Sequence, residues 1–74
     1  MKLYIIEWWD HVGDAGWVEH PEKMKPARCK TIGWLVHEDK ESIKLADTLT
    51  DDDGVGGISL ILKSAIIKKR KLEV

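Results

Sequence analysis

The sequence predicts an all-β protein, a small five-stranded SH3-like barrel formed by residues 1–74 as a single domain. Three observations indicate this class. Aromatic and β-branched residues gather in short runs, such as MKLYIIEWWD, and this enrichment is typical of strands. Polar or glycine-rich clusters separate the runs. No stretch keeps a helical period beyond one or two turns, and no internal repeat is present.

The order of these runs predicts a long first loop and a short 3-10 turn before the last strand. Residues 11–27 contain two glycines, two prolines and scattered charge, which favours a loop. Polar residues predict turns at 38–41 and 50–57, and the LKSA segment breaks the last apolar run. The five strands are expected at residues 1–10, 28–37, 42–49, 58–63 and 66–72.

Three of the four tryptophans lie within ten positions, and strand geometry separates two of them. Neighbouring side chains of a strand point to opposite faces, so Trp8 and Trp9 cannot both enter one core. If Tyr4, Ile6 and Trp8 face inward, the outer stripe comprises Leu3, Ile5 and Trp9. We expect Trp34 to pack inward from the second strand and Trp17 to fold the loop back over the outer tryptophan.

The segment ISLILKSAIIKKRKL resembles the SH3-like and Sm-like barrels, in which a 3-10 turn joins the last two strands. The whole chain is similar to small uncharacterised bacteriophage and prophage proteins. The matching residues are Glu7-Trp8, Gly16-Trp17 and Gly33-Trp34-Leu35-Val36. This resemblance implies a phage origin and a location in the host cytoplasm. The late Arg-Gly or Lys-Gly pair of Sm-like proteins and the ALYDY-like start of peptide-binding SH3 domains are both missing from the sequence.

Composition and motifs argue against several functions. The formal net charge of −1 gives no global attraction to nucleic acid or anionic membrane. Cys29 is the single cysteine, which excludes an internal disulfide and a cysteine-based zinc site and suits a reducing cytoplasm. No apolar run is long enough to span a bilayer. No histidine pair has metal-ligand spacing and no serine lies in a nucleophile motif, so we expect no enzyme activity, metal or cofactor.

The surplus of tryptophan and isoleucine predicts a protein-interaction module. An outer stripe of Leu3, Ile5 and Trp9 is too apolar to remain in water, so the loop through Trp17, a second protomer or a partner protein should cover it. The partner is expected to be a host or phage protein, in host takeover or inhibition of a host defence enzyme. Self-association through a shared LYIIEWW edge is the other protein-binding hypothesis.

The alternative function is binding of single-stranded nucleic acid or a nucleotide. A cluster of cations close to exposed aromatic rings is the pattern that supports it. Strand alternation divides the cluster between two faces, and lysines also protect edge strands from aggregation, so the same pattern fits a solvated edge. The cluster comprises Lys63, Lys68, Lys69, Arg70 and Lys71.

Overall fold

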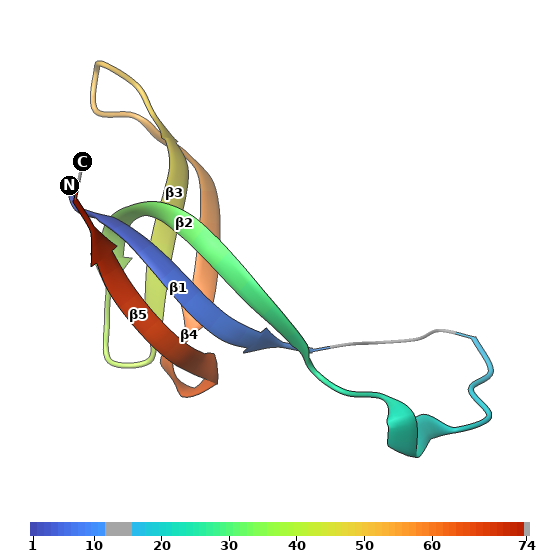
Figure 1. Ribbon diagram of the computed structural model, residues 1–74. Helices are drawn as coiled ribbons and strands as arrows, with labels where there is room; N and C mark the ends of the chain where they lie inside the picture. Colours follow the sequence, from blue (N-terminus) through green and yellow to red (C-terminus); the bar gives the residue numbers. More distant parts are fainter. Residues whose placement is uncertain (12–15, 74) are drawn as a thin grey trace.

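The computed structural model describes residues 1–11 and 16–73 and contains five antiparallel strands in one sheet (Figure 1). The strands are β1 (Leu3–Asp10), β2 (Ala27–Glu38), β3 (Ser42–Leu49), β4 (Val55–Leu62) and β5 (Ile66–Leu72). Two 3-10 turns are present, η1 (Pro21–Lys23) and η2 (Lys63–Ala65). The strand order across the sheet is β4-β3-β2-β1-β5. The prediction of an all-β fold is therefore confirmed.

The predicted connections agree with the structure except at one turn. The 3-10 turn expected at LKSA is η2. The long first connection contains η1, and residues 12–15 of that connection lie outside the described part of the chain. β4 begins at Val55 and not at Ile58, so Gly56 and Gly57 belong to a strand. Gly57 has a φ of 62°, and a Cβ there would collide with the carboxylate of Asp47. This backbone conformation requires glycine. The turn predicted over residues 50–57 therefore ends before Val55, where β4 begins.

The core lies between β1 and the β3–β4 hairpin, on the inner face of the curved sheet. Ile6, Ile43, Leu45 and Ile61 are almost fully buried, and Tyr4, Trp8, Leu35 and Ile66 pack against them. The choice that alternation left open for β1 is therefore decided, with Trp8 facing inward and Trp9 outward. The indole Nε1–H of Trp8 donates a hydrogen bond of 2.9 Å to Oγ1 of Thr31, so its polar group is satisfied at the core boundary.

Trp34 lies on the outer face, and the prediction that it packs inward is wrong. Trp34 is opposite Leu3, whereas its neighbour Gly33 is opposite the inward-facing Tyr4. A Cβ on Gly33 would lie 2.8 Å from the carbonyl oxygen of Ala46, since β2 and β3 approach closely here. The inner face at this point has no room for any side chain, so the large one must point outward.

The sheet is not closed into a barrel. β4 and β5 are its two edges, and no ladder joins them in the described chain. After Ile66, the inner face of β5 carries Lys69 and Lys71, which are opposite Ile6 and Tyr4. These lysines offer no apolar surface that could seal β5 against β4. β1 lies between β2 and β5 with both of its edges paired, so LYIIEWW cannot be an edge shared by two protomers.

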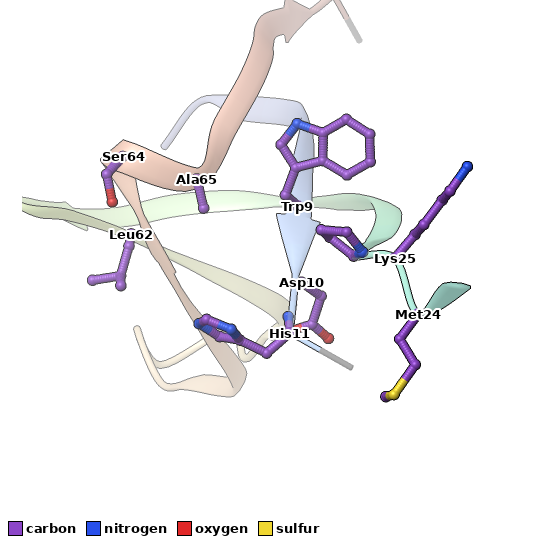
Figure 2. Close-up of a pocket in the computed structure, with 9 residues that line it drawn as sticks. Trp9, Asp10, His11, Met24, Lys25, Leu62, Ser64 and Ala65 are labelled. Carbon is purple, nitrogen blue, oxygen red and sulfur yellow. The ribbon is translucent and has the colours of Figure 1, made fainter. Parts of the chain in front are cut away.

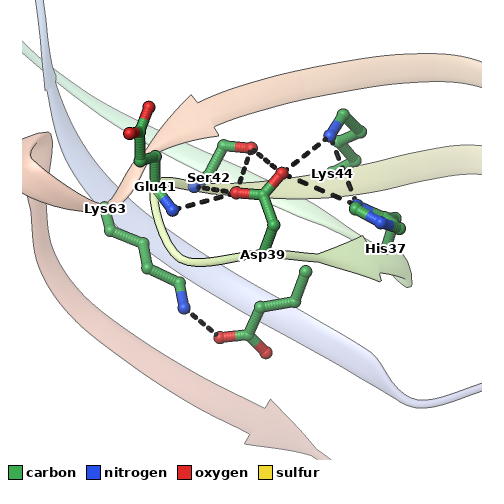
Figure 3. A network of polar contacts seen from close by, with 7 residues as sticks. His37, Asp39, Glu41, Ser42, Lys44 and Lys63 are labelled. Atoms are coloured by element: carbon green, nitrogen blue, oxygen red, sulfur yellow. Dashed lines mark hydrogen bonds and ion pairs between the residues drawn. The ribbon is translucent and has the colours of Figure 1, made fainter.

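Asp39 organises the turn between β2 and β3 (Figure 3). Its Oδ1 accepts hydrogen bonds from the backbone N–H groups of Glu41 at 2.9 Å and Ser42 at 2.8 Å. The Ser42 hydroxyl and the Lys44 ammonium also donate to this carboxylate. These donors, the two backbone groups above all, hold the pKa of Asp39 well below its usual range. The turn therefore depends on an ionised carboxylate.

Candidate binding surface

An open groove of about 450 Å³ lies where β1 ends beside η2 (Figure 2). We call it the Trp9 groove. Three segments form it: the end of β1, the residues just before β2, and the β4–η2 junction. Its lining comprises Trp9, Asp10, His11, Met24, Lys25, Pro26, Leu62, Ser64 and Ala65. Figure 2 shows Leu62, Ser64 and Ala65 on one side and Trp9, Lys25 and Met24 on the other.

Trp9 is the large aromatic side chain available to a ligand in this groove. It remains 47% exposed although it belongs to a strand, because the pleat turns Trp8 to the core and Trp9 outward. Leu62 and Met24, also exposed, add flexible apolar surface to the groove. A half-exposed tryptophan beside aliphatic side chains can bury a large apolar area against a partner.

Trp17 does not cover this surface. Residues 16–26, the described part of the connection before β2, extend away from the sheet (Figure 1), and Trp17 is fully exposed there. The prediction that Trp17 folds the loop back over Trp9 is therefore wrong. Residues 16–26 bury no side chain completely and include two prolines, so little apolar burial is available to dock this segment on the sheet. The structure thus leaves Trp9 open and places Trp17 elsewhere.

Leu3 and Ile5 share the outer face of β1 with Trp9, as predicted, but strand neighbours cover them in part. Leu3 is opposite Trp34 and Leu72, and Ile5 is opposite Ile32 and Arg70. Both are half-buried. The predicted outer stripe is therefore most accessible at its Trp9 end.

The cations expected for the alternative function are divided between the two faces. Lys69 and Lys71 lie on the inner face, where Nζ of Lys69 is 5.6 Å from the centroid of the Tyr4 ring. Oε2 of Glu38 lies 2.8 Å from Nζ of Lys63 and 3.9 Å from Nζ of Lys69. The hydrogen bond from Lys63, and then the charge of Lys69, lower the pKa of Glu38. Two of the five cations are thus paired with one carboxylate.

A different set of cations gathers on the outer face. Lys68 and Arg70 project from β5, and Arg28 and Lys30 project from β2, with β1 between them. We call these four residues the basic face. Sequence reasoning missed Arg28 and Lys30 because they are far from the KKRK run. Their spacing of two in a strand was the signal that they share one face.

Glu7 lies at the centre of the basic face. Its side chain is 17% exposed, and its Oε1 is 3.2 Å from Nη2 of Arg28 and 4.0 Å from Nζ of Lys30. Lys68 is its cross-strand partner on the other side. One carboxylate among four cations leaves the face positive. Trp9 is opposite Arg28, so the basic face and the exposed ring adjoin.

The remaining candidate chemistry is dispersed. His20 pairs with Glu22 at 3.2 Å, and His37 contacts Lys44. Across residues 1–11 and 16–73, no three His, Cys, Asp or Glu side chains are grouped so as to hold a metal ion. In the same part of the chain, no helix is long and apolar enough to cross a membrane.

Comparisons with known proteins add no relative to this description. No protein-family model matches the sequence, and no curated protein or solved structure is significantly similar to it.

Proposed function

We propose that this chain is a non-enzymatic protein-interaction module that docks on another protein through the Trp9 groove. The observation that carries the proposal is the half-exposed indole of Trp9 in an open groove shared with Leu62 and Met24. Tryptophan is enriched among the residues that dominate binding energy at protein interfaces. A groove of this kind suits an apolar side chain or turn of a partner.

We also propose a fold family, a biological origin and a cellular location for this module. The strand order β4-β3-β2-β1-β5 and the 3-10 turn between β4 and β5 support an SH3-like topology in an open form. The resemblance to small phage proteins supports a phage origin, a host or phage partner and a cytoplasmic location. Host takeover or inhibition of a host defence enzyme is the process we propose for such a partner.

The test is an affinity capture from bacterial host lysate with matched tryptophan variants. Trp9→Ala removes the ring in the groove, whereas Trp17→Ala removes an exposed ring outside it. We expect the wild type and Trp17→Ala to retain the same protein and Trp9→Ala to lose it. With that protein purified, titration calorimetry should show a Kd about 30-fold weaker for Trp9→Ala, as expected for loss of a hot-spot residue. Equal retention by all three chains would remove the groove from the proposal.

Single-stranded nucleic acid is the second candidate, and the basic face beside Trp9 favours it. Binding of this kind combines phosphate contacts with base stacking on an aromatic ring. A single-stranded oligonucleotide should then quench Trp9 fluorescence, and log K should fall linearly with log salt. Arg28→Gln should reduce that salt slope by about 1. Absence of binding at low salt would eliminate this candidate.

A further inference from the structure

A hollow of about 230 Å³ lies on the outer face of β1, between β2 and β5. Its lining residues are Ile5, Glu7, Lys30, Lys68 and Arg70. The three cations among them all belong to the basic face. Ile5 and Glu7 come from the central strand β1, whereas the cations come from the strands on either side of it. Positive side chains therefore flank the hollow on both sides.

The carboxylates of the described chain do not neutralise these cations. Glu7 is the one carboxylate of the hollow, and its Oε1 lies 3.2 Å from Nη2 of Arg28 and 4.0 Å from Nζ of Lys30. Lys68 and Arg70 form no ion pair within the described part of the chain. Four cations and one carboxylate leave the basic face positive on a chain whose net charge is −1. An anionic partner is therefore attracted to this face.

We propose that the partner docked in the Trp9 groove is acidic and that its carboxylates bind in this hollow. The inference rests on the proposed function, because Trp9 lies opposite Arg28 and so joins the groove to the basic face. Glu7 and Ile5 precede Trp9 by two and four positions in one strand, so the hollow lies about 7–13 Å from the ring. An extended segment lying along β1 would then carry its carboxylates about two to four residues from the apolar side chain in the groove.

Two features of the basic face favour the carboxylates of a protein over the phosphates of a single strand. Glu7 lies between Lys30 and Lys68, so a continuous phosphate backbone joining the two cationic sides would cross its carboxylate. Separate acidic side chains can bind on either side of it. The exposed neighbour beyond the cations is Ile32, which is 55% exposed and opposite Ile5. Single-strand binding stacks successive bases on aromatic rings, whereas an aliphatic side chain suits the apolar parts of a protein segment.

Peptide titration followed by backbone-amide chemical shifts tests the inference. The probe is a peptide in which one leucine is followed, after a Gly-Ser spacer, by two glutamates. Its control peptide carries glutamines in place of the glutamates. The variant Lys68→Gln/Arg70→Gln removes two positive charges from the hollow. Lys2→Gln/Lys40→Gln is the matched control, because it removes two exposed lysines that lie outside the hollow and form no ion pair in the described chain.

We expect the glutamate peptide to shift the amides of the hollow and of the Trp9 groove. Lys68→Gln/Arg70→Gln should weaken its binding about 10-fold, as the loss of two partly screened ion pairs predicts. The glutamine peptide should bind the wild type about 10-fold more weakly for the same reason. Lys2→Gln/Lys40→Gln should bind the glutamate peptide as the wild type does.

The outcomes separate this inference from the groove itself. Equal affinity of the two peptides for the wild type would overturn the acidic partner, and a loss of both in Trp9→Ala would leave the groove in place. A glutamate peptide weakened by Lys68→Gln/Arg70→Gln but not by Trp9→Ala would support the hollow and contradict the groove. Absence of binding by the glutamate peptide would overturn the inference. Tighter binding of an oligothymidylate of equal charge would overturn it in favour of single-stranded nucleic acid.

Discussion

The substitutions Gly33→Ala and Gly56→Ala should change the free energy of unfolding in opposite directions. Gly33 lies where β2 approaches β3, and a new Cβ would be 2.8 Å from the Ala46 carbonyl oxygen and 3.0 Å from Cβ of Leu45. Both neighbours belong to the buried part of β3 and cannot move aside. Overpacking of this kind costs about 1–3 kcal/mol. The lower chain entropy of alanine offsets about 0.5–1 kcal/mol, so the middle of both ranges gives a net loss of about 1 kcal/mol.

Gly56 has room for a methyl group. The nearest atom to its Cβ position is Cβ of Thr48 at 4.0 Å, and its φ lies outside the left-handed region. Alanine therefore meets no clash, and the stiffer unfolded chain should stabilise the protein by about 0.4–1 kcal/mol. A domain of this size has a total stability of about 4–11 kcal/mol, so both changes are measurable.

Urea unfolding followed by tryptophan fluorescence measures both free energies, with linear extrapolation to water. The expected order of stability is Gly56→Ala, then the parent, then Gly33→Ala. A Gly33→Ala variant as stable as its parent would refute the close approach of β2 to β3 and the outward placement of Trp34 that follows from it.

Three other substitutions test the polar contacts. Thr31→Val removes the acceptor of the Trp8 indole and should lower the free energy of unfolding by about 1–2 kcal/mol in urea titrations; an unchanged value would contradict this bond. The folded-state pKa of Asp39 is lowered, so its stabilisation is present above about pH 4 and is lost as pH falls through the folded value. Asp39→Asn should therefore be less stable at pH 7, with a difference that narrows in acid; a constant difference would argue against the ionised turn. Glu7→Gln should destabilise the protein more at low salt than at high salt, because Arg28 and its neighbours then repel one another.

The period of two in the sequence predicts the strands and divides β1 into two stripes, but it leaves open which of Trp8 and Trp9 faces outward. Tyr4, Ile6 and Trp8 form the inner stripe because they pack against the core residues of β3 and β4. The prediction for Trp34 was wrong because alternation assigns residues to two faces but does not say which face is the inner one. That choice depends on the approach of β3 at Gly33, a contact between residues distant in sequence.

The binding surface was predictable only at Trp9. The Trp9 groove also needs Met24 and Leu62, which come from two other segments and meet only through the sheet order. The basic face likewise combines two strands that are not neighbours in the sheet, so the KKRK run indicates Lys68 and Arg70 but not Arg28 and Lys30. Barrel closure was inferred from the number and order of the strands, whereas the structure is one open sheet with β4 and β5 as its edges.

An open sheet explains why this small protein exposes so many large apolar side chains. Ile58, Leu60 and Leu62 alternate along the edge strand β4, and each is about half exposed. The Trp9 groove lies at the Leu62 end of β4. The open edge that limits the size of the core therefore also leaves exposed the apolar side chain of Leu62 that the proposed docking surface uses.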